Sequence, residues 1–471
     1  MMATNPTDFR DNRREVLTMK TTLTTIVFLW VAYLPIAGSL ERAWASEEIA
    51  RLPELRLSLR EAMDAAVDNN PTVRLMKERV RAAQATANTS LGAMLPNLSG
   101  FVNERNQTVN LAAFGLPSNR LSSLGLPSSG VTDPFNVFNA RATIVQSLFS
   151  LSLIQRWQTA RTGVEVATLD AEVTKRNTIA IVGLLYMEAL RADAAVKATE
   201  ANLELDRQLL ELARERRKAG KAIGLDVTRA QVQLENDKQR LLAAQNDRDS
   251  AKLTLIRALG IEFGVTLLLT DQLQLADLVA QHPDEAVTVA RENRAELKAQ
   301  AMRQRQADLT LRSITSERLP SVDFNGDYGF LSRTVENAPT TYTVGVMLVV
   351  PIFDGGQREG RISEARSKVF QESIQMQDIS AQVSLEVRDA LLKLSSSREQ
   401  VQVAQNGLGL ARQELDLARE RFAAGIGDNI AVITAQTSVA RARDNLIEGL
   451  FRFNASRVNW ARAQGQLEML Y

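Results

Sequence analysis

The chain contains one sequence pattern twice, and this duplication limits its possible folds more than any other feature. Residues 213–231 and 418–436 align without a gap at a shift of 205 residues, sharing Ala-Arg-Glu-Arg, Ala-Gly, Val and Ala-Gln. In both copies a charged helical pattern meets Ala-Gly and resumes a few residues later. Glycine supplies the positive φ that a helix end needs. Each copy therefore predicts the tip of a helical hairpin, at about residues 216–226 and 421–431.

Long helices are expected on both sides of each tip. The pattern predicts helices from Leu151 to Ala219, Leu225 to Leu259, Gly356 to Ala423 and Ile430 to Leu467. A further single helix is predicted from Asp284 to Arg318, before the strands of the second half. A helix of about 68 residues is about 100 Å long at ~1.5 Å per residue, so such helices must lie side by side in a bundle or tube. A heptad supports this packing, with small residues three positions after each large one. Its large residues are Val387, Leu394, Val401, Leu408, Leu415 and Phe422.

Each half also carries two segments with the alternation of β-strands, at about residues 97–105 and 138–149, and at about 321–331 and 342–353. Apolar and polar residues alternate over about ten residues, the length that a tilted membrane strand requires. Four strands cannot close a barrel, since closed barrels begin at about eight, and open edges in lipid leave backbone groups unpaired. The strands therefore predict a barrel shared between subunits. The first half has a longer insert between its strands, Thr108 to Asn136, which we expect to be a surface loop.

Composition and targeting signals point to export. The 56 Lys and Arg balance the 55 Asp and Glu of the 471 residues, so charge gives no indication of a nucleic-acid partner. Residues 1–45 are predicted to be a non-mature leader and secretory signal peptide, ending at Ala43-Trp44-Ala45. The mature chain would then contain two repeats, 46–283 and 284–471. Beyond the signal no apolar run reaches the roughly 18 to 20 residues of a membrane helix, so any membrane span must consist of strands.

The residues that usually carry catalysis or bind metals are scarce. The chain has no Cys, and its single His, His282, precedes Pro283 in a predicted loop. Gly355-Gly356 does not have the spacing of a phosphate-binding loop and instead predicts a turn between a strand and a helix. We therefore predict no catalytic, cofactor-binding or metal site and no enzymatic activity, and any transport would be passive or driven by a partner.

These features together resemble the TolC-type outer membrane efflux protein family. The resemblance rests on tandem halves, paired long helices, Leu-Pro before the strands, Pro351 to Gly356 after them, and Arg-x-x-Ala-Gly at each tip. It implies a homotrimer with a twelve-stranded outer membrane β-barrel and a twelve-helix periplasmic tunnel. It also implies two partners, a periplasmic adaptor and an inner membrane pump.

The resemblance assigns roles to residues at the tips. Arg216, Gly220, Arg421 and Gly425 match the family's tip pattern, which is the expected contact with the adaptor. Lys221 stands where the family usually has a small or apolar residue and makes the first tip strongly basic. A role of Lys221 in choosing the partner is a hypothesis, whereas the simpler interpretation is solvated charge at a helix end.

A periplasmic gate is implied at the same place. Asp226 matches an acidic position at the tunnel mouth, and a ring of three Asp226 residues is the minimal gate. Its position just after a turn is equally typical of a helix N-terminal cap. The second copy departs from the family, because Phe422 stands where a Tyr is frequent and Ala431 where an Asp is expected. Asp428 is the candidate to compensate.

The expected function is a passive exit duct in the outer membrane for small molecules or a polypeptide. The alternative is a secreted helical scaffold or adaptor without a pore. The strands favour the channel, because a soluble coiled coil has no need of four segments with membrane-length alternation. The sequence does not indicate the cargo, the pump or the adaptor.

Overall fold

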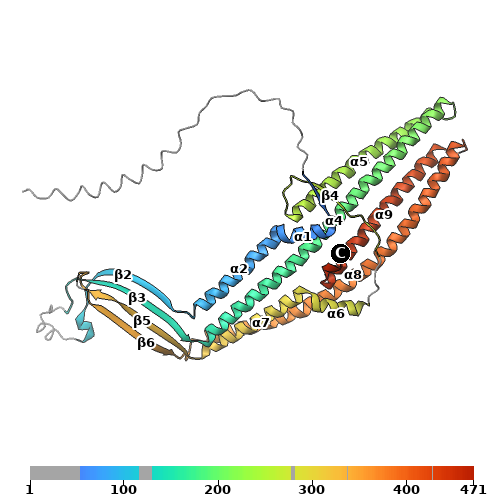
Figure 1. Ribbon diagram of the computed structural model, residues 1–471. Coiled ribbons are helices and arrows are strands. Elements are labelled where there is room, and N and C mark those ends of the chain that lie inside the picture. Colours follow the sequence, from blue (N-terminus) through green and yellow to red (C-terminus); the bar gives the residue numbers. More distant parts are fainter. Residues whose placement is uncertain (1–52, 116–129, 277–281, 337, 427, 471) are drawn as a thin grey trace, which may run out of the picture. The chain divides into compact units, whose positions relative to one another are not determined.

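The computed structural model describes residues 53–115, 130–276, 282–336, 338–426 and 428–470, and these belong to one compact unit, Pro53–Tyr471. The predicted signal peptide, 1–45, lies outside the described residues, as does the middle of the first-half insert. The described residues are mainly helical, with one four-stranded sheet and one two-stranded sheet (Figure 1). The predicted class, mainly α with a small β part, is confirmed.

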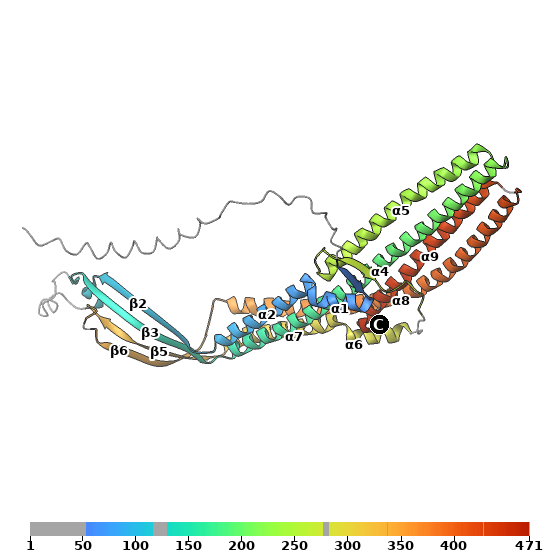
Figure 2. The ribbon, with the colours of Figure 1, turned by 45° about the horizontal axis from the view of Figure 1, so that its top comes forward.

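Each half consists of shorter helices followed by a long hairpin. The α-helices are α1 (Leu59–Asn69), α2 (Pro71–Gly92), α4 (Leu151–Lys218), α5 (Gly224–Leu259), α6 (Pro283–Asn293), α7 (Ala295–Thr315), α8 (Gln357–Ala423) and α9 (Asn429–Gln464). Short 3-10 turns are η1 (Leu111–Phe114), η2 (Ser316–Arg318) and η3 (Leu467–Leu470). Helix α4 lies beside α5, and α8 lies beside α9 (Figures 1 and 2). In the described part of the chain, no helix has the length and apolar character needed to cross a bilayer.

The heptad predicted the core of the hairpins correctly. All six large residues of the α8 heptad are buried, from Val387 to Phe422. In α4 the equivalent positions Val182, Ala189, Val196, Leu203 and Leu210 are buried as well. These side chains form clusters with residues of α5 and α9, so burial of the seam, rather than helix propensity, holds the long helices together.

The predicted single helix from Asp284 to Arg318 is wrong, because the chain is extended at Arg294 (φ −66°, ψ 119°) between α6 and α7. The guanidinium of Arg294 is buried and donates to Glu386 of α8 at 2.9 Å and to the carbonyl of Ala463 at 3.4 Å. Asn70 makes the same break between α1 and α2 (φ −61°, ψ 126°), and these two breaks are 224 residues apart, as are Pro96 and Pro320. The repeat therefore keeps the break although its second copy has no proline there.

Four antiparallel strands form the larger sheet in the order β2-β3-β5-β6. They are β2 (Asn97–Gln107), β3 (Phe135–Phe149), β5 (Ser321–Ser332) and β6 (Thr340–Val349). All four predicted strands are present, but the last ends at Val349 and not at 353. Strand β6 ends there because its neighbour β5 begins at Ser321, which pairs with Val349. The residue before Ser321 is a proline, which has no N–H to donate to a further pair.

The register of the sheet gathers the apolar side chains on one face. Tyr328 lies opposite Tyr342, and Gly326 opposite Val344, so the alternating faces of neighbouring strands coincide. The other face is polar, and there Arg141 of β3 donates to Asp327 of β5 at 2.6 Å. Among the described strands β2 and β6 have one neighbour each, which leaves an open edge on either side of the sheet.

A small parallel sheet that the sequence did not predict joins β1 (Glu54–Leu57) to β4 (Thr266–Leu269), which lies in the expected linker after α5. Tyr186 of α4 fastens this sheet to the helices. Its buried hydroxyl lies 3.0 Å from the carbonyl oxygen of Leu57 and 2.9 Å from the carboxylate of Asp271, and its single proton is shared between these two acceptors. Burial raises the pKa of Tyr186, so the hydroxyl keeps this proton.

Candidate functional site

The first hairpin tip begins where α4 ends. Gly220 has a φ of +70°, and its N–H donates to the carbonyl of Arg217 at 3.0 Å. The N–H of Lys221 donates to the carbonyl of Arg216 at 2.8 Å. This pair of bonds satisfies the last carbonyls of a helix that ends in a left-handed residue. Only glycine adopts that conformation without strain, so Gly220 sets the sharp turn.

The second tip repeats this geometry at the shift of 205 residues. Gly425 has a φ of +82°, and its N–H donates to the carbonyl of Phe422 at 3.1 Å. The N–H of Ile426 donates to the carbonyl of Arg421, also at 3.1 Å. The duplication read from the sequence therefore extends to individual backbone hydrogen bonds.

The two tips are in contact, and Arg216 makes the principal contact. Its guanidinium lies over the ring of Phe422, 4.3 Å from the centroid, and donates to the carbonyl oxygen of the same residue. The side chain of Asn429 donates to the backbone carbonyl of Asp226 at 3.0 Å. Of the predicted site residues the structure thus brings Arg216 and Phe422 together, whereas Lys221 and Arg421 are exposed.

Both acidic residues proposed for the gate accept a backbone hydrogen bond at a helix start, Asp428 as the N-cap of α9 and Asp226 from the first turn of α5. The carboxylate of Asp226 accepts a bond from the N–H of Ile223 at 3.3 Å, at the start of α5. That of Asp428 accepts from the N–H of Ile430 at 3.2 Å, at the start of α9. The side chain of Phe422 is only 4% exposed and packs in the hairpin core. These contacts give all three residues a structural role, and the gate stays a prediction.

The surface of the tips is partly apolar, which the sequence did not predict. Ile426 is 76% exposed and Ile223 is 62% exposed, each close to the glycine of its turn. Leu225 and Ile430 add further exposed side chains. A groove with a volume of about 330 Å³ lies next to them between α5 and α9. Its lining residues are Thr228, Arg229, Val232, Gln233, Ile430, Ile433 and Thr434. The sequence signal that could have predicted this surface is the presence of Ile223 and Ile426 beside the turns in otherwise charged segments.

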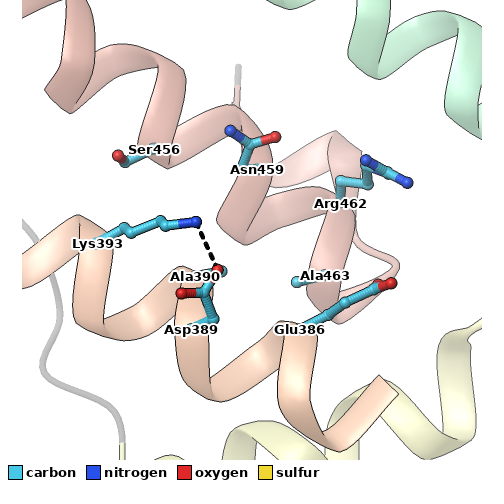
Figure 3. Close-up of a pocket in the computed structure, with 8 residues that line it drawn as sticks. All are labelled: Glu386, Asp389, Ala390, Lys393, Ser456, Asn459, Arg462 and Ala463. Atoms are coloured by element: carbon cyan, nitrogen blue, oxygen red, sulfur yellow. Dashed lines mark ion pairs between the residues drawn. The ribbon is translucent and has the colours of Figure 1, made fainter. Parts of the chain in front are cut away.

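Another cavity lies between α8 and α9 and has a volume of about 260 Å³ (Figure 3). Its charged residues already have partners. Lys393 pairs with Asp389 at 2.7 Å, Glu386 accepts from Arg294, and Arg462 donates to Asn177 at 3.2 Å. The first pair lies within α8, the other two connect neighbouring elements, and none of them assembles a nucleophile with a base. Within the described ranges, no group of three or more acidic or histidine residues is placed to hold a metal ion.

Comparisons with known proteins agree with this architecture. Outer membrane protein TolC of Vibrio cholerae is 22% identical over 417 residues, covering 87% of this chain and 91% of that protein. Outer membrane protein OprJ of Pseudomonas aeruginosa is 23% identical over 448 residues, covering 92% and 90%. The crystal structure of the Campylobacter jejuni CmeC outer membrane channel has the same fold, with a TM-score of 0.74 at 17% identity, covering 87% and 86%.

A family match covers both halves of the chain. The family described as outer membrane efflux protein matches residues 62–261 and 286–466, which include both hairpins and all four strands of the larger sheet. These two stretches make up most of the chain, and the resemblance found in the sequence is confirmed. The chain belongs to the outer membrane efflux protein family.

Proposed function

We propose that three copies of this chain form a channel that conducts substrates passively through the outer membrane, as one component of a tripartite export complex. The observation that carries the proposal is the pair of open edges, β2 and β6, on a sheet whose apolar side chains gather mainly on one face. In lipid an unpaired strand edge is costly, because no water is present to satisfy the backbone groups. Joining β6 of one copy to β2 of the next would pair every edge.

The helices support the same ring. Helix α8 packs on α7 and α9, while α2 and α5 pack on α4, so α8 and the α2/α5 pair form opposite borders of the helical layer. Both borders carry exposed apolar residues. On α8 they are Phe370, Ile374, Leu385, Leu392, Val403, Leu410 and Leu417, and on α2 and α5 they are Leu75, Val232, Leu242 and Leu253. A contact between these two different surfaces would be a head-to-tail interface, which forms a ring when its rotation closes.

Strand count and family support three copies. Two copies would give eight strands, the smallest closed barrels, and three would give twelve. The trimer is the assembly that membership of this family implies. A scaffold without a pore, the alternative considered from sequence, leaves the apolar sheet and both of its edges unexplained.

The hairpin tips are the proposed docking site for a periplasmic adaptor, which would connect the channel to an inner membrane pump. Related proteins support such partners, since TtgC of Pseudomonas putida is described as a probable efflux pump outer membrane protein. Lys221 and Arg421 are exposed at the same turns as the exposed apolar residues Ile223 and Ile426. The pump would provide the energy for transport, and the channel would catalyse no reaction. At rest, Asp226, Asp428 and Phe422 would close the entrance of the channel.

The absence of cysteine from the sequence allows a clean test of the ring. Leu417 on α8 and Val232 on α5 are both exposed and lie at similar distances along the chain from their tips. In the double variant Leu417→Cys/Val232→Cys, oxidation should produce covalent dimers and trimers. Either single variant should not, nor should Leu415→Cys/Val232→Cys, because Leu415 is buried. Only monomers from the double variant would contradict this interface.

A further inference from the structure

A buried acidic residue interrupts the core of the first hairpin. Asp206 of α4 is 2% exposed and lies among the leucines of the hairpin cluster, including Leu203 and Leu209. Its heptad position carries alanine at Ala192 and Ala213 on the same helix. An ionised carboxylate in such surroundings loses its hydration and must be compensated or neutralised.

A second carboxyl group lies against it. Asp237 of α5 is 3% exposed, and its side chain contacts that of Asp206. Among the residues that the structure describes, Oδ2 of Asp206 is buried without a hydrogen-bond donor. Two adjacent buried carboxylates repel each other, whereas one proton shared between them removes the repulsion and provides the missing donor.

Nearby positive charge is directed to Asp237 rather than to Asp206. Arg240 of α5 donates to Asp237 at 2.9 Å, and Gln233 donates to the other oxygen of Asp237 at 3.4 Å. Arg240 makes no hydrogen bond to Asp206, and although its charge lowers the pKa of Asp206, burial and Asp237 raise that pKa more. Asp206 is therefore the group that takes the proton.

Helices α8 and α9 complete the electrostatic environment. Arg443 of α9 donates to Asn202 of α4 at 2.6 Å and faces Arg412 of α8, while Asp444 adds a further partly buried acid. Burial and the contact with Asp237 raise the pKa of Asp206 to about 8. Burial likewise raises the pKa of Asp444.

The second hairpin shows that this pair is not needed to build the fold. At the shift of 205 residues the equivalents of Asp206 and Asp237 are Ala411 and Ala442, and both pack in the same cluster. The α8–α9 hairpin forms with two methyl groups where the α4–α5 hairpin has two carboxyl groups. The acidic pair is therefore a property of the first hairpin that its architecture does not require.

We propose that Asp206 and Asp237 form a proton-binding pair that holds one shared proton at neutral pH and makes the stability of the first hairpin depend on pH. Unfolded, Asp206 loses its proton near its ordinary pKa of about 3.9. Folded, it keeps the proton up to about pH 8. The folded state thus binds more protons between these values, and its stability falls as the pH rises from about 4 to about 8, then levels off. The site does not depend on the channel function.

Infrared spectroscopy of the purified full-length protein tests the pair directly. The wild type should show the carbonyl band of a buried protonated carboxyl group at about pH 6, and this band should disappear by about pH 9. Asp206→Asn should lack the band. Asp249→Asn should keep it, since Asp249 is an exposed acid on the same helix as Asp237. A wild-type spectrum without the band at about pH 6 would overturn the proposal, even if the variants failed to fold.

Denaturation provides a second, independent readout. The wild-type guanidinium midpoint should decrease relative to that of Asp206→Asn as the pH rises from about 6 to about 8, and the difference should then remain constant. Asp206→Ala/Asp237→Ala, which reproduces the alanine pair of the second hairpin, should be equally free of this decrease. Parallel curves for the wild type and both variants would show that no proton is bound there.

Discussion

The guanidinium of Arg216 lies over the ring of Phe422 at 4.3 Å and donates to the carbonyl of that residue, so the end of α4 is fastened to the end of α8. The two residues are not equivalent in the repeat. At the shift of 205 residues Arg216 corresponds to Arg421, and Phe422 corresponds to Arg217. Both copies thus keep the same turn and the same arginine, while the divergence at Phe422 allows one tip to contact the other.

Arg216→Ala should loosen the second tip. It removes a cation–π contact worth about 0.5–1 kcal/mol and a charged hydrogen bond worth about 1.5–3 kcal/mol. Hydrogen exchange of the amides from 421 to 432 should accelerate by roughly ten-fold or more, since about 1.4 kcal/mol is a factor of ten. Arg421→Ala is the matched control because it removes the equivalent but exposed arginine. Equal acceleration in both variants would argue against the contact.

The capping bonds of Asp226 and Asp428 predict similar local effects. Asp226→Ala and Asp428→Ala should each reduce the stability of the first turn of its helix, α5 or α9, by about 1 kcal/mol. Exchange of the first-turn amides in each variant measures this. Asp226→Asn and Asp428→Asn should retain part of the cap, because the amide oxygen still accepts a bond. An unchanged first turn in the alanine variants would show that the carboxylates do not cap.

Gly329 of β5 should not tolerate a side chain. A Cβ there would lie 2.2 Å from the carbonyl oxygen of Ala140 on β3, and backbone cannot move away cheaply. Gly329→Ala should therefore disrupt the β3–β5 pairing and strongly reduce the yield of folded protein recovered from outer membranes. Gly100→Ala on β2 has open space and should behave like the wild type. Normal recovery of Gly329→Ala would mean that the two strands are farther apart than described.

Breaking the buried ion pair of Arg294 should be among the most damaging changes. Arg294→Ala removes the cation that is hydrogen-bonded to Glu386 and leaves only the charge of Arg462 nearby. Disruption of a fully buried pair costs about 3–5 kcal/mol, and the cost here should be somewhat lower because Glu386 is 33% exposed. Arg291→Ala, at an exposed position one turn earlier, should cost less than about 0.5 kcal/mol. Denaturant titration compares the two. Similar midpoints for both variants would contradict the structural role of Arg294.

Glu386 makes that effect depend on pH. Burial alone would raise the pKa of Glu386, but the hydrogen bond from Gln382 and the charge of Arg294 together lower it. A carboxyl group with a lowered pKa stabilises the folded state above its unfolded pKa, and this contribution disappears as the pH falls through the folded value. The difference in denaturant midpoint between the wild type and Arg294→Ala should therefore decrease as the pH is lowered into the acid range.

The sequence predicted features that depend on local chemistry or on periodicity. The heptad gave the buried seam, alternation gave the strands and their apolar face, and Ala-Gly gave both turns. The sequence did not predict the helix break at Arg294. An extended residue that is held by its buried side chain leaves no local signal when proline is absent. Pairing of β1 with β4 was missed for a related reason, since it joins segments more than 200 residues apart.

Side-chain partners across the repeat were also out of reach. The sequence marked Phe422 as a gate residue and Arg216 as an adaptor contact, yet their contact with each other depends on how the two hairpins pack. The burial of Asp206 could not be predicted for the same reason, because an acidic residue in a helical sequence usually lies on the solvated face. Only the packing of α5 and α9 shows that it is buried.

Single-channel conductance in a planar bilayer, with the mass of the purified protein in detergent, tests the central claim most directly. The account predicts a species with the mass of three copies that forms a narrow pore. Conductance should be larger for Asp226→Ala than for the wild type if the Asp226 ring closes the entrance, and Asp428→Ala provides the comparison. A trimeric pore whose conductance is unchanged by Asp226→Ala would leave Asp226 with only its structural role at the start of α5. Well-folded protein that is monomeric and does not conduct would contradict the channel.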